Sequence, residues 1–368
     1  MTTFDTISEQ VGDNSSVKQG KVHFLDAGEP NEPKEGFRIK KAANKAFKIL
    51  ASIALGLGFA AGATAAVLTF TATSTVALPI ATTVAIVCAV VLAVLLTLKV
   101  WEKISPHLPN SLRLTGNYIQ SAVLGLASAV ALGIIFPIDC AKSNPKPEEI
   151  DPKQPLRLAI HGFLGSSSNW IYHLYRFKEA GLKNFASINL GNWCHSIDDY
   201  ADKVHKMVVQ YKKGMVQAKL IKEEDTLHVQ FVCHSMGGLV ARHYNQKYAK
   251  KDGVIVDDIC TLGTPLNRTK VAVFAWWSKA GREMFEKEFT DNQRRRAATE
   301  NEETRHYYIA SKCDYVIRPL TSATDGNTPK KRTKVYWLDA TGHVSYLFSD
   351  KAADKLIAYL KKRNQENG

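Results

Sequence analysis

A serine lies between small residues at the junction of a predicted strand and a predicted helix. Residues 227–233 (LHVQFVC) form a buried strand pattern, and Gly237 and Gly238 open an amphipathic helical pattern. A nucleophilic serine needs such a sharp turn, because its hydroxyl must project while the residues two before and two after it stay small. The sequence therefore predicts that Ser235 is a nucleophile. Cys233 replaces the usual glycine two residues before it and is small enough for the turn.

Two later loops carry a candidate base and a candidate acid for this serine. A serine hydroxyl needs a base to attack a carbonyl at neutral pH, and the imidazole that serves as base needs a carboxylate to orient it. His343 lies in a glycine-containing loop (DATGHVSYL) after a predicted strand, residues 334–338. Asp314 follows another predicted strand, residues 306–311. These two residues are the predicted base and acid.

Other side chains stay open for both roles. The alternative acids are Asp325 and Asp339. The alternative bases are His306, His243 and His228. His343 is favoured because, among these histidines, it alone lies in a glycine-flanked loop late in the chain after a strand.

Five motifs follow one another in the second half of the chain. They are HGFLG at 161–165, HSMGG at 234–238, LGTP at 262–265, Asp314 in SKCDYVIRP, and His343 in DATGHVSYL. Together they resemble the α/β-hydrolase superfamily, and within it the lipase-like serine esterases that include triacylglycerol lipases. The order nucleophile, acid, histidine is the order of that superfamily. The resemblance covers residues 155–362, a little over half of the chain.

The resemblance implies a role for each motif residue. Ser235 would attack the carbonyl carbon, His343 would take and return its proton, and Asp314 would hold the imidazole. The backbone N–H groups of Phe163 and Met236 would form the oxyanion hole. The residues expected to shape these turns without reacting are His161, Gly162, Gly165, His234, Gly237 and Gly238. No metal and no organic cofactor is implied.

The element pattern predicts a minimal α/β-hydrolase fold of about six mostly parallel strands with flanking helices. The expected strands are residues 156–160, 185–190, 227–233, 255–262, 306–311 and 334–338. The domain is expected to span 156–362, followed by a short tail at 363–368. Residues 267–303 form an aromatic-rich insertion, which is either a lid over the acyl pocket or ordinary packed core.

The first third of the chain has a different composition. Residues 1–48 form a polar and then basic tail, and residues 49–98 contain no charged residue over 50 positions. About 20 apolar residues suffice for a helix to cross a bilayer. The predicted transmembrane region, 49–138, holds candidate spans at 49–71, 78–98 and, most weakly, 114–138. A proline-rich stretch at 139–155 has the composition of a linker.

Charge and cysteine content limit the partners and the compartment. The chain carries a net charge of +13, but its basic residues are scattered and accompany no nucleic-acid motif, so solvated surface or anionic lipid headgroups explain them better. The six cysteines show no metal-type spacing and no disulfide framework. Basic flanks place the catalytic domain opposite the cytoplasm if all three segments span. Free thiols and an interfacial third segment would place it in the cytoplasm.

These observations favour a membrane-anchored serine hydrolase that cleaves carboxylic esters, with a lipid-like acyl ester as substrate and the membrane as its surroundings. A thioesterase that acts on acylated proteins, or an amidase, would use the same three residues. The alternative from another class is a catalytically idle hydrolase fold that serves as an interaction module. The complete set of Ser235, Asp314 and His343 argues against this alternative.

Overall fold

The structure, a computed structural model, describes residues 110–135, 140–292, 304–325 and 328–367. The tail at 1–48 and the expected spans at 49–71 and 78–98 lie outside these residues. The expectations for those segments therefore remain predictions. The described residues include most of the expected hydrolase domain, 156–362.

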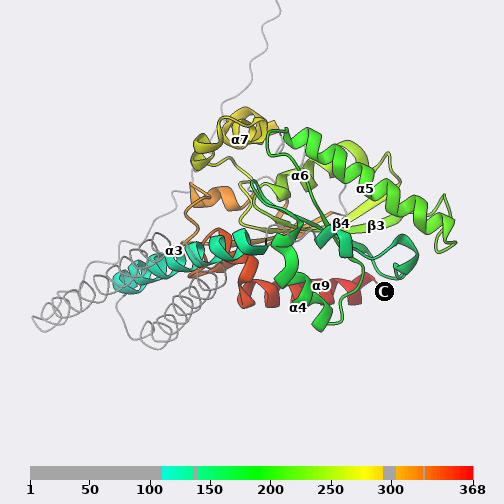
Figure 1. Ribbon diagram of the computed structural model, residues 1–368, viewed down its shortest axis with the longest axis horizontal. Helices are drawn as coiled ribbons and strands as arrows, with labels where there is room; N and C mark the ends of the chain where they lie inside the picture. Colours follow the sequence, from blue (N-terminus) through cyan, green and yellow to red (C-terminus); the bar gives the residue numbers. More distant parts are fainter. Residues whose placement is uncertain (1–109, 136–139, 293–303, 326–327, 368) are drawn as a thin grey trace, which may run out of the picture. The chain divides into compact units, whose positions relative to one another are not determined.

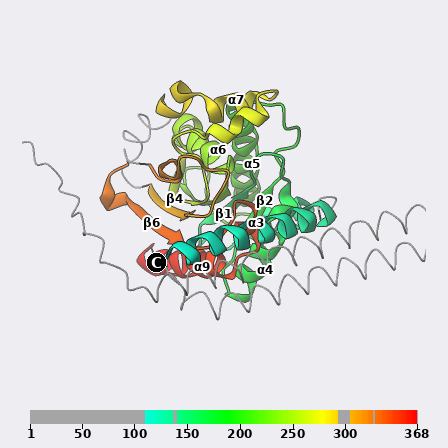
Figure 2. The same ribbon diagram turned by 90° about the vertical axis from the view of Figure 1, so that its left-hand side faces the viewer.

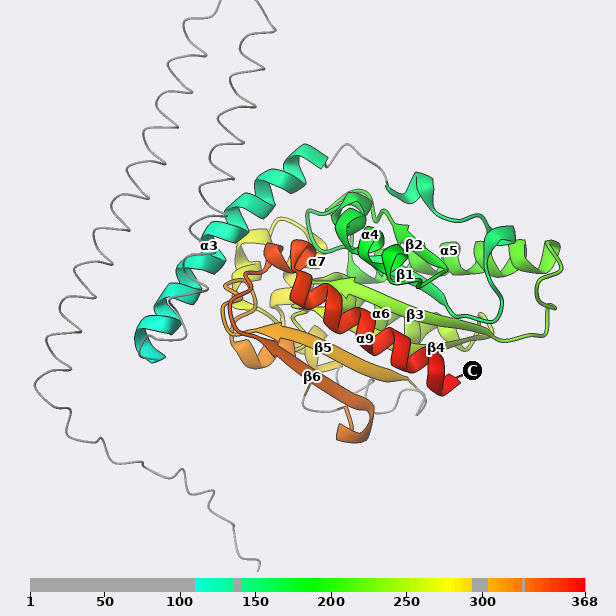
Figure 3. The same ribbon diagram turned by 90° about the horizontal axis from the view of Figure 1, so that it is seen from below.

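Six parallel strands form one twisted sheet in the order β2-β1-β3-β4-β5-β6 (Figure 3). The strands are β1 (Leu156–Ile160), β2 (Phe185–Ile188), β3 (Leu227–His234), β4 (Val254–Leu262), β5 (Arg305–Ser311) and β6 (Thr333–Leu338). All six predicted strands are present, each at or close to its expected bounds. Because the strands are parallel, the segments that follow them meet at one edge of the sheet.

Helices cover both faces of the sheet, with α5 and α6 on one side and α4 and α9 on the other (Figure 1). Their bounds are α4 (Ile171–Glu179), α5 (Ile197–Gln217), α6 (Gly237–Tyr244), α7 (Lys279–Phe285) and α9 (Asp350–Asn367). Short helices connect them: η2 (Cys140–Ser143), η3 (Pro147–Glu149), η4 (Ser167–Trp170), η5 (Asn245–Ala249), η6 (Lys270–Ala275), η7 (Leu320–Ala323), η8 (Lys330–Arg332) and η9 (Val344–Phe348). Each face has its own apolar core. The predicted α/β architecture is therefore confirmed for this domain.

Helix α5 shows how local sequence builds these layers. Ser196 caps its N-terminus by accepting from the Asp199 amide at 3.0 Å, and Asp199 accepts in return from the Ser196 amide at 2.9 Å. Such reciprocal capping satisfies backbone donors that the first helical turn leaves unpaired. The buried side chains recur at helical spacing from Ile197 to Met215. One apolar face therefore packs on the sheet.

Residues 140–155, the described part of the predicted linker, make specific contacts with the domain. The Cys140 and Ile150 side chains are buried. The side-chain amide of Asn144 donates to the Ser187 carbonyl and accepts from the Ser187 amide, both at 2.8 Å. Asn144 thus pairs with the exposed backbone of edge strand β2. The described part of this stretch belongs to the domain.

Helix α3 (Asn110–Ile135) contacts the domain at η9 and η4. Its Ser121 side chain is buried, and the Tyr118 hydroxyl donates to the Lys312 carbonyl oxygen at 2.9 Å. The helix therefore turns a polar and small-residue face toward the domain.

None of the helices in the described ranges has the length and apolar character that crossing a bilayer requires. The predicted third span, 114–138, overlaps α3 as far as Ile135, and the structure does not support it.

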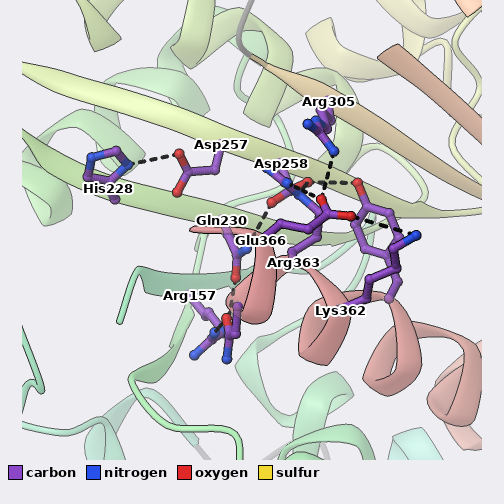
Figure 4. A network of polar contacts seen from close by, with 11 residues as sticks. Arg157, His228, Gln230, Asp257, Asp258, Arg305, Lys362, Arg363 and Glu366 are labelled. Atoms are coloured by element: carbon purple, nitrogen blue, oxygen red, sulfur yellow. Dashed lines mark hydrogen bonds and ion pairs between the residues drawn. The ribbon is translucent and has the colours of Figure 1, made fainter. Parts of the chain in front are cut away.

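A network of charged side chains fastens α9 beneath the sheet (Figure 4). Arg363 donates through Nε to Asp258 Oδ1 at 2.9 Å, and Gln230 donates to Asp258 Oδ2 at 2.8 Å. Arg157 Nε donates to the Gln230 amide oxygen at 2.9 Å. Helix α9 continues to Asn367, so the predicted tail at 363–368 is largely helical and contributes a buried anchor, Arg363.

Candidate active site

Motif residues gather where the strands end. Ser235 follows β3, Gly263 follows β4, and His161 follows β1 directly. Asp314 and His343 lie a few residues beyond β5 and β6. The parallel sheet brings these separate segments to one edge, which is where ligands bind in open α/β sheets.

Ser235 is held in a strained turn. Its backbone has φ of 52°, in the left-handed region that side-chain-bearing residues rarely adopt. The Ser235 amide donates to the Leu262 carbonyl at 2.9 Å, and the Thr264 hydroxyl donates to the Ser235 carbonyl at 2.8 Å. Strain of this kind costs about 1–3 kcal/mol and persists only where surrounding contacts enforce it. Here the β4 end and the LGTP loop enforce it.

A continuous hydrogen-bonded chain joins the predicted nucleophile, base and acid. Ser235 Oγ lies 2.9 Å from His343 Nε2, and His343 Nδ1 lies 2.9 Å from Asp314 Oδ2. A carboxylate can only accept, so Nδ1 carries the proton and donates it to Asp314. Nε2 then has a lone pair that accepts from the serine hydroxyl. This arrangement can remove a proton from Ser235 as the oxygen attacks.

Asp314 is set up to remain ionised although it is fully buried. Its Oδ1 accepts from the amides of Val316 at 2.9 Å and Ile317 at 3.0 Å. Burial alone would raise the pKa of Asp314, but the facing His343 imidazole and these hydrogen bonds hold the pKa below its usual value. The carboxylate is therefore charged at neutral pH and can stabilise an imidazolium.

The alternative acids lie elsewhere. Asp325 forms a buried ion pair with Arg242, and Asp339 is exposed. The alternative bases are equally accounted for: His243 pairs with Asp198 at 2.7 Å, His228 pairs with Asp257 at 2.8 Å, and His306 is buried on β5. Within the described ranges, no cluster of three or more His, Cys, Asp or Glu side chains is arranged to hold a metal ion.

The predicted oxyanion donors flank Ser235. Gly162 lies so close that a Cβ added to it would come within 2.8 Å of Ser235 Cβ. In the part of the chain that the structure describes, the N–H groups of Phe163 and Met236 donate no backbone hydrogen bond. The Met236 N–H also lies at the N-terminus of α6, where the helix dipole favours negative charge. Two free donors beside a nucleophile can bind a developing oxyanion.

The remaining motif glycines allow close backbone approach. A Cβ on Gly237 would collide with the Ile160 carbonyl oxygen, and one on Gly238 would collide with the Thr264 side chain. A Cβ added to Gly165 would lie 2.5 Å from the side-chain nitrogen of Asn169. Only glycine lets α6 and the loop after β1 pack together here.

Buried histidines around the site hydrogen-bond to backbone groups of distant segments, a role that the sequence pattern did not reveal. His234 Nε2 lies 2.9 Å from the His343 carbonyl oxygen, and His173 Nε2 lies 2.9 Å from the Tyr346 carbonyl oxygen. His161 Nε2 accepts from the Leu190 amide at 2.9 Å. The only sequence signal was their position inside or near motifs.

These three histidines are neutral at working pH. Burial lowers the pKa of His161 and His173 to about 4, and burial together with the nearby His343 lowers the pKa of His234 to about 3. Because a carbonyl oxygen only accepts, His234 and His173 carry their proton on Nε2. Both therefore donate to the segment that begins at the candidate base.

The insertion at 267–303 lies beside the oxyanion loop as far as the structure describes it. The Trp277 ring packs on the Phe163 ring with centroids 5.6 Å apart. The Ala280 amide donates to the His195 carbonyl at 3.0 Å, and Glu283 accepts from the Ile197 amide at 2.7 Å. Residues 293–303 fall outside the described residues. The segment with η6 and α7 therefore borders the site.

Comparison with known proteins finds likeness only among solved structures. No family model matches the chain, and no curated protein matches its sequence. A Listeria innocua protein, the product of the gene lin2722, is 15% identical over 57% of this chain and 94% of its own, with a TM-score of 0.42.

Two further matches carry a named activity. One solved structure, described under the metagenome-derived lipolytic enzymes LipS and LipT, is 13% identical over 58% of this chain and 99% of its own, with a TM-score of 0.44. The Paleococcus ferrophilus monoacylglycerol lipase is 10% identical over 58% of this chain and 96% of its own, with a TM-score of 0.43. The matching structures thus include lipases and esterases of the α/β-hydrolase superfamily, which the motifs resembled.

Proposed function

We propose that this chain is a serine hydrolase that cleaves carboxylic esters through an acyl-enzyme. The observation that carries the proposal is the hydrogen-bonded chain from Ser235 through His343 to Asp314, with distances of 2.9 Å and 2.9 Å. The free N–H groups of Phe163 and Met236 beside it support the same chemistry. A packing role alone does not require a base aligned on a strained serine.

In the first half-reaction the Ser235 hydroxyl oxygen attacks the ester carbonyl carbon while His343 Nε2 accepts the hydroxyl proton. The N–H groups of Phe163 and Met236 hold the negative oxygen of the tetrahedral intermediate. The imidazolium, stabilised by Asp314, then donates its proton to the leaving alkoxide, and the ester C–O bond breaks. The alcohol departs and leaves the acyl group on Ser235.

In the second half-reaction water takes the place of the alcohol. His343 Nε2 accepts one water proton as the water oxygen attacks the acyl carbonyl carbon. The same two N–H groups hold the oxyanion, and the imidazolium returns the proton to Ser235 Oγ as the acyl bond breaks. A carboxylic acid is released and the starting state is restored.

The proposed substrate is a lipid-like ester, and the proposed enzyme is tethered to a membrane. The support for tethering is the run of 50 uncharged residues from 49 to 98, which lies outside the described residues. A tethered enzyme meets a lipid substrate at high effective concentration. Resistance of the full chain to alkaline extraction from membranes tests the tether, and protease protection reads the side on which the domain lies.

Labelling with a fluorophosphonate probe tests the mechanism. The full chain should react covalently, and Ser235→Ala should abolish labelling and reduce ester turnover by about 10⁶-fold. Ser345→Ala is the matched control, because Ser345 is a buried serine near His343 with no assigned role. An active Ser235→Ala enzyme would overturn the mechanism. Turnover of matched ester, thioester and amide substrates then separates the esterase from the thioesterase or amidase.

A further inference from the structure

Large apolar side chains are exposed on two segments that border the candidate active site. Phe274 is 84% exposed, and Trp276 is 50% exposed. We call the following five residues the apolar rim: Ile119, Val123, Val273, Phe274 and Trp276. Exposed apolar patches mark sites of contact with proteins or membranes, and Val273, Phe274 and Trp276 are neighbours on one short segment.

The two segments lie on either side of the same edge of the sheet. Helix α3 contacts η9, which follows His343 directly. On the other side, Trp277, next to the rim, packs on Phe163. Figure 2 looks onto this edge and shows α3 crossing one side of it and α7, which follows η6, on the other. The rim therefore flanks the approach to Ser235.

Basic residues outnumber acidic ones on the two segments, where α7 adds a single acidic residue, the half-buried Glu283. Residues 110–135 and 263–282 contain no Asp or Glu. They carry five basic residues: Arg113, Arg268, Lys270, Lys279 and Arg282. Arg113, Lys270 and Lys279 are exposed. Apolar and aromatic side chains among basic residues are the composition of surfaces that sit in the headgroup region of anionic bilayers.

We propose that the apolar rim rests on an anionic lipid bilayer, with Phe274 and Trp276 inserted on one side of the active-site mouth and the outer face of α3 on the other. The position of α3 in the chain favours lipid as the occupant. This helix begins 12 residues after Leu98, the last residue of the uncharged run, so in a chain that leaves a bilayer there α3 starts no farther than about 40 Å from its surface. The mouth of the site then faces the bilayer.

Tryptophan reporters in the full chain test this orientation. Phe274→Trp and Ile119→Trp place an added indole on each side of the rim, and Val335→Trp places one at an exposed position of edge strand β6 as the matched control. Each variant is mixed with vesicles of phosphatidylcholine and phosphatidylglycerol that contain brominated acyl chains. The wild-type emission is subtracted, so any signal from other tryptophans cancels.

The expected result is quenching and a blue shift of the added emission at positions 274 and 119, with neither change at 335. Vesicles of phosphatidylcholine alone should give weaker quenching, because the basic residues lose their anionic partners. Equal quenching of all three reporters, or none at 274 and 119, overturns the proposal. Protection of the rim reporters from aqueous acrylamide without vesicles also overturns it, because a second copy or another segment then covers the rim.

Turnover of two esters, one embedded in vesicles and one soluble, separates the role of the rim from the chemistry at Ser235. This test rests on the proposed esterase function. Phe274→Glu should lower turnover of an ester embedded in anionic vesicles about tenfold, because a charged side chain opposes insertion, and leave turnover of a soluble short-chain ester unchanged. Val335→Glu should change neither rate. If Phe274→Glu and wild type turn over the embedded ester equally fast, the proposal that the rim rests on the bilayer is overturned. If the wild-type chain turns over neither ester, the esterase proposal is contradicted. The tryptophan reporters then still test whether the rim binds the bilayer.

Discussion

Two parts of the sheet hold buried polar groups in opposite ways. Within the strands, Arg157, Gln230 and Asp258 are direct cross-strand neighbours on β1, β3 and β4, and they hydrogen-bond to one another and to Arg363 (Figure 4). At the ends of the strands, Ser235 is strained and the Phe163 and Met236 donors are free. The polar groups within the strands satisfy one another, whereas those at the strand ends stay available for reaction.

This contrast separates stability from chemistry. A buried charge is tolerated where partners satisfy it, and removing one partner is then costly. A reactive serine needs donors and a base that are not already satisfied. We therefore expect changes at the Asp258 network to lower stability with little effect on reaction at Ser235, and changes around Ser235 to do the reverse.

The largest expected effect is on chemistry, from Asp314→Asn. The asparagine oxygen can still accept from Val316 and Ile317, but its amide cannot hold the His343 tautomer that serves as base. Turnover should fall about 10⁴-fold while the unfolding midpoint changes little. Asp339→Asn, at an exposed carboxylate in a nearby loop, is the control. A comparable loss in the control would show that Asp314 is not the acid.

The second largest expected effect is a loss of stability in Arg363→Met. This change leaves the Asp258 carboxylate buried without its cation and should cost about 3–5 kcal/mol in the free energy of unfolding. Lys362→Met, at the adjacent exposed position, should cost little. Urea denaturation measures both values. The comparison fails if folded Arg363→Met reacts with a fluorophosphonate much more slowly than wild type.

His234 tests whether a neutral histidine positions the candidate base. His234→Leu removes the donor to the His343 carbonyl, and a small displacement of the base should lower kcat about 10- to 100-fold with KM unchanged. His234→Gln, whose amide reaches a similar position, should restore part of the rate. An equal loss in both variants would indicate a packing role only.

The smallest effect concerns pH and Glu283 on α7. Burial raises the pKa of Glu283 to about 7 in the folded chain, from 4.5. Folding therefore becomes less favourable as pH rises, because the unfolded carboxyl ionises more readily, and the loss is complete above the folded pKa. With the carboxyl partly exposed, we expect about 1 kcal/mol between pH 5 and pH 8.

Glu283→Gln keeps an acceptor for the Ile197 amide but cannot ionise. Thermal unfolding of wild type and variant at pH 5 and pH 8 measures the difference. The variant should gain stability relative to wild type at the higher pH only. A constant difference at both pH values would show that Glu283 does not titrate in this range.

Much of the domain follows from local sequence. The six strands were predicted close to their observed bounds, because buried parallel strands are short apolar runs between turn residues. The turn at Ser235 was also predictable, since only small residues permit it. The order of the motifs placed Asp314 and His343 after strands of one parallel sheet, which is enough to expect them at one edge.

Other features depend on contacts between distant segments. Arg363 lies in a basic run that resembles exposed tail, yet it is buried against Asp258. The stretch at 139–155 has the composition of a linker, but its Asn144 pairs with the β2 backbone. The segment at 114–138 has the composition of a weak membrane span, and the described part of it contacts η9.

The sequence by itself therefore determined which segments form strands, which serine occupies the turn and which loops can supply a base and an acid. Only the tertiary structure decided that His343 Nε2 lies 2.9 Å from Ser235 Oγ, that His234 holds the His343 backbone, and that Arg363 is buried. The physical reason is range. Strand and turn preferences act within a few residues, whereas these contacts join residues about a hundred positions apart and form only when the sheet register and the helix packing bring them together.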